Sequence, residues 1–130
     1  MIVIDASAAI SLLINDEHGE LVHARLRQDD AVLHAPHLVD LEVLQVLRRY
    51  FRSDRMNVSR ADEALADFQM LPIRRHAHEA FLPRIWELRD SLTAYDAAYI
   101  ALAEALDVPL LTTDRRLAAS HGHDAEVELL

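Results

Sequence analysis

Short apolar runs alternate with longer segments of helical periodicity along this chain. Runs of strand length are expected at 2–4, 31–34, 72–75, 109–112 and 126–129. The segments between them repeat their apolar residues every three to four positions, which is typical of helices with one buried face. Strands separated by helices predict an α/β fold with a central parallel sheet of four to five strands.

The expected helices can be bounded by their capping residues. Ser7 is expected to cap the first helix, Ser59 a later one, and Thr93 the helix that contains Asp96, in the Ser/Thr-x-x-Asp/Glu pattern. Pro83 is expected to split or kink one helix, because proline lacks the amide proton that a helix interior needs. The expected helices are 7–15, 20–28, 38–51, 60–70, 77–89, 94–107 and 115–120.

Four acidic residues lie at positions that should pack toward a core. Asp5 ends the first apolar run, Glu42 lies on the apolar side of a helix, Asp96 opens an almost wholly apolar helix, and Asp114 follows the run 108–113. Buried carboxylates are costly unless they are paired or bound to a cation. Strand ends and helix starts meet at the carboxyl edge of a parallel sheet, where ligands bind. The four therefore predict a site for Mg²⁺ or Mn²⁺, which prefer oxygen ligands.

Each of these residues also has a purely structural explanation. Asp5 could cap the first helix in competition with Ser7, and Asp114 could cap the helix 115–120. Asp96 could complete a capping box, and Glu42 could pair with an arginine such as Arg49. Only the convergence of all four favours a metal site.

Composition narrows the possible chemistry. The 130 residues suggest a single domain over 1–130, and 52% hydrophobic residues are enough for a core. Cysteine is absent, which excludes disulfides and thiol nucleophiles and fits a cytoplasmic protein. No segment is long and apolar enough to span a membrane, and the N-terminus lacks the basic leader of a signal peptide.

Charge excludes further classes of protein. The net charge is −9, and all 13 basic residues are arginine. A simple electrostatic binder of nucleic acid should be basic. A nuclease remains compatible with this charge, because bound cations would offset the acidic site and local arginines can contact phosphates.

The chain resembles the PIN-domain ribonucleases of the VapC toxin type over its whole length. The resemblance rests on Asp5 within Ile2-Val3-Ile4-Asp5-Ala6-Ser7-Ala8, on Glu42, on Asp96 within Leu92-Thr93-Ala94-Tyr95-Asp96-Ala97-Ala98-Tyr99, and on Asp114 within Leu110-Leu111-Thr112-Thr113-Asp114. It implies a PIN fold with an acidic pocket at the carboxyl edge. It also implies a metal-dependent endoribonuclease of a toxin–antitoxin pair, a homodimer, and a small antitoxin whose tail covers the site.

The implied mechanism uses Asp5, Glu42, Asp96 and Asp114 to hold one or two Mg²⁺ or Mn²⁺ ions, which would activate a water for attack on an RNA phosphodiester. Arg115 and Arg116 adjoin Asp114 and are expected to contact RNA. A second arginine run, 48–55, could contact phosphate or simply stabilise a helix end.

Two other classes of α/β protein also have acidic residues at strand ends, but the chain lacks a residue that each requires. A phospho-accepting receiver domain needs a lysine near its site, and a haloacid-dehalogenase-type phosphatase needs Asp-x-Asp where this chain has Asp5-Ala6-Ser7. A PIN-fold RNA- or protein-binding module without turnover remains the alternative. The pair His76-x-His78 is not expected to bind metal, since residues two apart do not share a helix face. His121 and His123 flank Gly122 in an expected loop and are expected to meet solvent.

Overall fold

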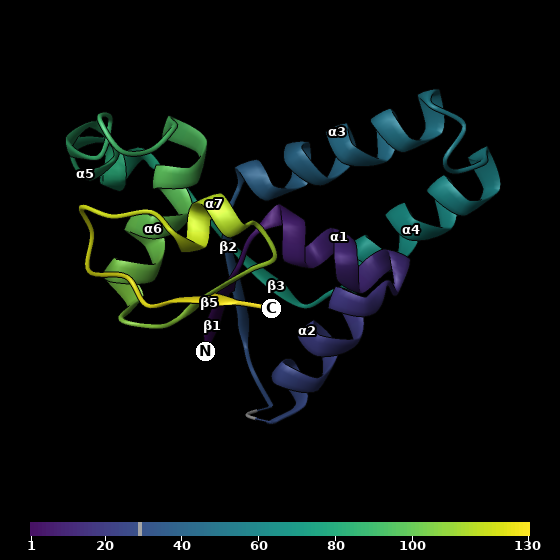
Figure 1. Cartoon of the computed structure of the whole chain (residues 1–130), viewed down its shortest axis with the longest axis horizontal. Coiled ribbons are helices and arrows are strands. Elements are labelled where there is room, and N and C mark those ends of the chain that lie inside the picture. The colour runs from purple at the N-terminus through teal and green to yellow at the C-terminus, as the bar shows by residue number, and fades with distance from the viewer. Residues whose placement is uncertain (29) are drawn as a thin grey trace.

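A five-stranded parallel sheet with helices on both faces forms the centre of the molecule (Figure 1). The structure is a computed structural model that describes residues 1–28 and 30–130. Its strands lie in the order β3-β2-β1-β4-β5, and every neighbouring pair is parallel. The strands are β1 (Ile2–Ile4), β2 (Leu33–Pro36), β3 (Ile73–His76), β4 (Leu110–Thr112) and β5 (Val127–Leu129). The predicted fold class is therefore confirmed.

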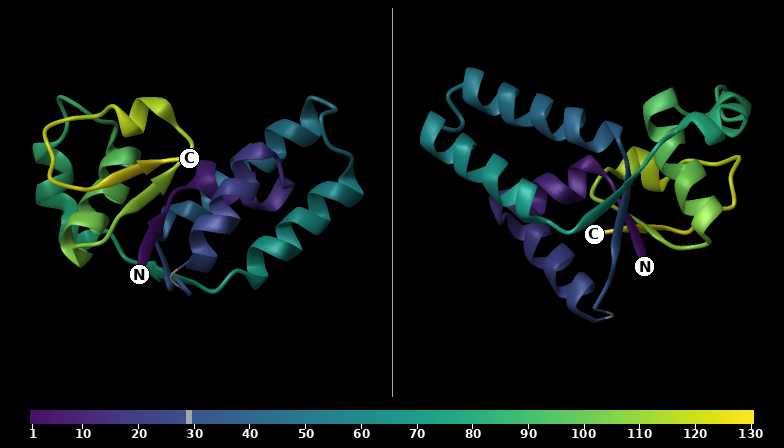
Figure 2. Two further views of the ribbon diagram at one scale, coloured as in Figure 1. Left: turned by 60° about the horizontal axis from the view of Figure 1, so that its bottom comes forward. Right: turned by 180° about the vertical axis from the view of Figure 1, so that it is seen from behind.

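Helices connect these strands and cover both faces of the sheet. They are α1 (Ala6–Ile14), α2 (Glu17–Gln28), α3 (Leu38–Arg52), α4 (Val58–Met70), a 3₁₀ turn (Glu79–Phe81), α5 (Leu82–Glu87), α6 (Ala94–Leu106) and α7 (Arg115–Ala118). The helices α1 to α4 gather on one side of the sheet, whereas α5 and α6 lie on the other (Figure 2). In the described part of the chain no helix has both the length and the apolar character needed to cross a membrane.

Two predicted helix caps were wrong, each for a local reason. Asp5, not Ser7, caps α1, because the Asp5 carboxylate accepts a hydrogen bond from the Ala8 amide. Asn57 likewise caps α4, so that Ser59 lies within its first turn. In both cases the residue two positions earlier has the extended backbone that a cap requires.

The predicted helix 77–89 is divided into two pieces. A 3₁₀ turn ends at Phe81 and α5 begins at Leu82, with Pro83 in its first turn. Proline is tolerated there because the first amide groups of a helix have no partner within it. The predicted strand 31–34 is shifted, since β2 runs to Pro36, which ends the strand and needs no further ladder bond.

The core explains why the carboxylates meet at one edge. All of β1 and β4 and the middle of α6 (97–103) are buried, as expected for strands covered on both faces and for an interior helix. The helices α1, α3 and α7 begin just after the ends of β1, β2 and β4. α6 leads back into β4, so its first turn also lies at the carboxyl edge.

Candidate active site

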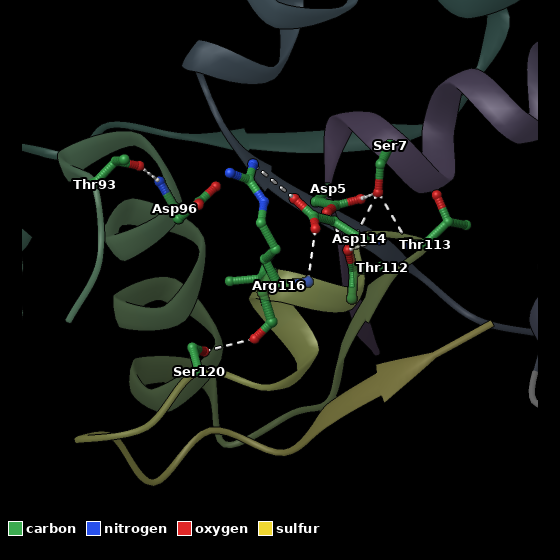
Figure 3. Close-up of polar contacts among 10 residues, drawn as sticks. Asp5, Ser7, Thr93, Asp96, Thr112, Thr113, Asp114, Arg116 and Ser120 are labelled. Atoms are coloured by element: carbon green, nitrogen blue, oxygen red, sulfur yellow. Dashed lines mark hydrogen bonds and ion pairs between the residues drawn. The ribbon is translucent and has the colours of Figure 1, made fainter.

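The four acidic residues named from the sequence come from four elements at the carboxyl edge of the sheet. Asp5 caps α1 after β1, and Asp114 caps α7 after β4. Asp96 lies in the first turn of α6, and Glu42 in the second turn of α3. Figure 3 shows Asp5, Asp96 and Asp114 facing a common space from three of these elements.

Asp5 is the most buried of the four, with 5% of its surface exposed. Its Oδ1 accepts hydrogen bonds from the Ser7 hydroxyl at 2.7 Å and from the Ala8 amide at 2.8 Å. Its Oδ2 accepts one from the fully buried Thr112 hydroxyl at 2.5 Å. Burial nevertheless raises the pKa of Asp5 above its ordinary value, and repulsion from Asp114 adds to that rise. The three hydrogen bonds oppose the rise without cancelling it.

The hydroxyl groups of Ser7 and Thr112 link the Asp5 carboxylate to the end of β4. Thr112 accepts a hydrogen bond from the Asp114 amide at 2.9 Å, and Ser7 accepts one from the Thr113 amide at 3.0 Å. The bonds from Thr112 to Asp5 and from Thr113 to Ser7 join the end of β1 to the end of β4, and those from Ser7 and Thr112 fix the direction of the Asp5 carboxylate. The sequence indicated polar residues at Ser7 and 112–113 but could not assign their partners.

Glu42 does not pair with Arg49, which was its expected structural partner. Its Oε1 instead accepts a hydrogen bond from the Tyr99 hydroxyl at 2.8 Å. Burial raises the pKa of Glu42, and repulsion from Asp96 and from Asp5 adds to that rise, while the hydrogen bond from Tyr99 opposes it.

Tyr99 contacts the candidate site, and sequence reasoning missed this contact because the side chain was assigned to the core. It is 1% exposed on α6. A signal did exist, because a tyrosine in an interior helix needs a partner for its hydroxyl. Burial raises the pKa of Tyr99 as well, and the nearby Glu42 charge adds to that rise, so the hydroxyl stays a hydrogen-bond donor.

Asp96 and Asp114 flank an arginine. The Thr93 hydroxyl caps α6 by accepting the Asp96 amide proton at 3.1 Å, as predicted, which leaves the Asp96 carboxylate turned toward the site. The Asp114 carboxylate accepts the Arg116 amide proton at 2.8 Å, and an Arg116 guanidinium nitrogen lies 3.6 Å from its Oδ2. In Figure 3 the Arg116 side chain reaches between Asp96 and Asp114, although 91% of it is exposed.

The carboxylates lie close enough together to raise one another's pKa values. Asp5 is repelled by Asp114, Glu42 by Asp96 and Asp5, and Asp96 by Asp114. The pKa of Asp96 is raised, first by burial and then by Asp114, whereas Arg116 lowers it. A site that holds three carboxyl groups with raised pKa values beside a fourth has the electrostatic character of a cation site.

The chemistry of the donors fits a hard divalent ion, but their present arrangement does not yet chelate one. Among the described residues no group of three or more His, Asp or Glu side chains is arranged to hold a metal ion. The carboxylates of Asp5, Glu42 and Asp114 instead accept hydrogen bonds from hydroxyl or amide groups of the protein.

The remaining candidates lie apart from this network. Arg115 is exposed, with no side-chain partner among the residues that the structure describes. His76 contacts the buried His34, whose Nδ1 lies 2.8 Å from His76 Nε2. His123 contacts Ser120, and His121 is exposed. Among the described residues neither histidine pair belongs to a group of three or more His, Asp or Glu side chains that could hold a metal ion.

The chain matches known sequences over nearly its full length. The family model of the PIN domain matches residues 2–120. A protein named Ribonuclease VapC12 from Mycobacterium tuberculosis is 42% identical over 130 residues, which cover 100% of this chain and 99% of the relative. Ribonuclease VapC9 from the same organism is 44% identical over 118 residues, covering 91% of this chain and 89% of the relative.

Solved structures share the fold at lower sequence identity. PAE2754 from Pyrobaculum aerophilum aligns with a TM-score of 0.73 and 22% identity, covering 97% of this chain and 81% of that one. Mycobacterium tuberculosis VapC20, described as a sarcin-ricin loop cleaving toxin, aligns with a TM-score of 0.66 and 20% identity, covering 95% and 97%. At these identities the likeness supports the fold.

Proposed function

The chain belongs to the PIN-domain family, and from that premise we propose that it is a VapC-type ribonuclease toxin that hydrolyses phosphodiester bonds in RNA. One observation carries the proposal: four elements each place one carboxylate at the carboxyl edge of the sheet, where burial and then a neighbouring carboxylate raise the pKa values of Asp5, Glu42 and Asp96. Such an arrangement lowers stability unless a cation is bound, so a purely structural role does not explain it. The relatives named as ribonucleases support the substrate class.

We propose Mg²⁺ or Mn²⁺ as the cofactor, held by Asp5, Glu42, Asp96 and Asp114. All four offer carboxylate oxygens, which are the ligands that these ions prefer. When bound, the ion would polarise a water molecule and offset the charge that develops on the phosphate. The chain contains no lysine to act as an alternative cation, and Arg116 is too exposed to neutralise all four groups.

The surrounding residues prepare these ligands. The hydroxyl groups of Ser7 and Thr112 hold the Asp5 carboxylate in one direction. The Tyr99 hydroxyl does the same for Glu42. Fixed ligands lower the entropy lost when substrate and ion bind, which is the usual role of such supporting residues.

Arg115 and Arg116 are proposed to contact the RNA backbone at the site. Arg116 already lies between two of the carboxylates, where its guanidinium can pass from Asp114 to a phosphate oxygen. Arg115 is exposed beside it and free to do the same. Charge reversal at either position is expected to weaken RNA binding and to reduce its salt dependence by about one ion per contact.

We further propose a homodimer in the cytoplasm and a small antitoxin partner whose tail covers the site. The antitoxin proposal is supported by an apolar hollow of about 250 Å³ that borders the first turn of α6. Its lining includes Leu82 and Tyr95, which are 54% and 66% exposed. Exposed apolar side chains of this size are typical of surfaces that bind another protein.

The experiment is a cleavage assay on structured RNA with Mg²⁺, Mn²⁺ or EDTA. Cleavage is expected only with metal and is expected to be lost in Asp5→Asn and Asp96→Asn. The matched control is Asp67→Asn, an exposed carboxylate on α4 outside the site. Cleavage that persists in EDTA or in both site variants overturns the mechanism. RNA binding without cleavage under every condition would instead favour the module without turnover.

A further inference from the structure

A cluster of four arginines occupies the end of α3 that is remote from the acidic residues. Its members, Arg48, Arg49, Arg52 and Arg55, are called here the α3 arginine cluster. All four side chains are exposed, and none has an ion-pair partner among residues 1–28 and 30–130.

The charge of the cluster exceeds what its helix can use. Residues 48–55 contain four arginines and one acidic residue, Asp54, which gives a local charge of +3 in a chain whose net charge is −9. The carboxyl end of a helix carries only about half a negative charge. Helix stabilisation therefore explains one arginine at most and leaves most of the positive charge unassigned.

The side chains of the cluster line an open hollow in the surface, which suits a planar or anionic group. The hollow has a volume of about 610 Å³ and is lined by the four arginines, Tyr50 and Ser53. The Arg55 guanidinium lies 4.3 Å from the centre of the Tyr50 ring. A stacked guanidinium keeps its outer edge available for two parallel hydrogen bonds to a phosphate.

A polar stripe along α3 connects the cluster with the acidic site. Glu42, Gln45, Arg49 and Arg52 are spaced at i, i+3, i+7 and i+10, so they lie on one side of the helix. At 1.5 Å per residue, Arg52 is about 15 Å from Glu42 along the axis. That length corresponds to about four stacked nucleotides at roughly 3.4 Å each. In Figures 1 and 2 the α3–α4 hairpin extends away from the sheet, which leaves its turn accessible.

We propose that the α3 arginine cluster is a second RNA-backbone site, which binds phosphates several nucleotides from the scissile bond held at the acidic residues. The inference rests on the proposed function, since it concerns the same substrate. It implies that the protein prefers long or folded RNA, because a short oligonucleotide at the acidic site cannot reach the cluster. RNA is favoured over an acidic protein segment because the stripe leads to Glu42 at the proposed cleavage site, and because an arginine can bind a phosphate through two parallel hydrogen bonds.

Two substrates that share one cleavage site test the proposal. One is a short oligonucleotide that covers only the acidic site, and the other is a structured RNA extended by at least ten nucleotides on each side. For Arg49→Glu/Arg52→Glu, KM on the extended RNA is expected to rise on the order of ten- to a hundredfold, with the short substrate unchanged. Arg49→Gln/Arg52→Gln should show a smaller change in the same direction, and Arg27→Glu on α2 serves as the charge-reversal control.

Binding measured in EDTA separates this inference from the proposed function. In wild type, the logarithm of the affinity for extended RNA should fall with the logarithm of salt, and the double variant should lose about two ions from that slope. This readout does not require cleavage. An equal effect of the variants on both substrates, or no effect on the extended one, overturns the proposal. Unchanged RNA binding together with weakened antitoxin binding would assign the cluster to an acidic protein segment instead.

Discussion

Replacing Asp5 with asparagine should separate the structural role of this carboxylate from its role as a ligand. If Asp5 were there only to cap α1 and to hold Ser7 and Thr112, its three hydrogen bonds to a charged acceptor would stabilise the fold. A hydrogen bond to a charged group is worth about 1.5–3 kcal/mol, against about 0.5–1.5 kcal/mol for a neutral one. On that structural explanation Asp5→Asn should lower the free energy of unfolding by roughly 3 kcal/mol.

The direction of the pKa shift predicts the opposite sign. The folded-state pKa of Asp5 is raised, chiefly by burial, so the folded protein binds the proton more tightly than the unfolded chain does. The contribution of Asp5 to stability is therefore fully present at low pH. It falls as pH rises through the pKa of the unfolded chain toward the raised pKa of the folded protein. At neutral pH the charged form is a net cost, which asparagine removes. We expect metal-free Asp5→Asn to unfold at a higher Tm than wild type at neutral pH.

Divalent ions should reverse that order. A ligand at a hundred times its Kd stabilises the folded state by about 2.7 kcal/mol, which corresponds to roughly 10 °C here. Thermal unfolding with and without Mn²⁺ should show this gain in wild type and in Asp67→Asn but not in Asp5→Asn, whose RNA cleavage should fall on the order of a hundredfold or more. Destabilisation of the metal-free variant by about 3 kcal/mol, with the Mn²⁺ response intact, would refute the reasoning.

Three further outcomes follow from single contacts. Tyr99→Phe removes the hydrogen-bond donor to Glu42, so it should lower the free energy of unfolding by about 1.5–3 kcal/mol and weaken Mn²⁺ binding. A loss of stability with unchanged Mn²⁺ affinity would limit the hydroxyl to a structural role. Burial lowers the pKa of His34, so stability should decline as pH falls below about 6.5. His34→Asn keeps a hydrogen-bond partner for His76 and should flatten that decline, measured by denaturant titration at several pH values. A Cβ at Gly19 would lie 2.1 Å from a carbonyl oxygen of α1. Gly19→Ala should therefore lower the free energy of unfolding, measured by urea titration, by more than the ~1 kcal/mol of an ordinary substitution.

The strong local patterns in the sequence were sufficient to predict the elements. The segment 97–103 is apolar on all sides and is buried in α6 as predicted. The order of strands and helices fixed which ends share an edge, which is why the carboxylates were expected to meet. Such features depend on periodicity within a few residues and survive any tertiary context.

The capping errors and the partner of Glu42 show where sequence reasoning stopped. Asp5 and Ser7 are both good caps two residues apart, and the path of the chain out of β1 decides between them. Glu42 had an arginine seven residues away on its own helix, yet its partner is Tyr99, 57 positions along the chain on α6. Pairings between elements depend on how those elements pack, and no spacing within one segment encodes that.

The separation between the acidic site and the α3 arginine cluster explains how a chain of net charge −9 can attract RNA. Charges of opposite sign on one helix cancel for a distant ligand when they are closer than the screening length. At physiological ionic strength that length is about 8 Å, whereas Glu42 and Arg52 are about 15 Å apart along α3. A phosphate near the α3–α4 turn therefore meets the arginines with little opposition from the carboxylates. The acidic site then receives the strand through contacts along the stripe, where a bound ion and Arg116 offset its charge.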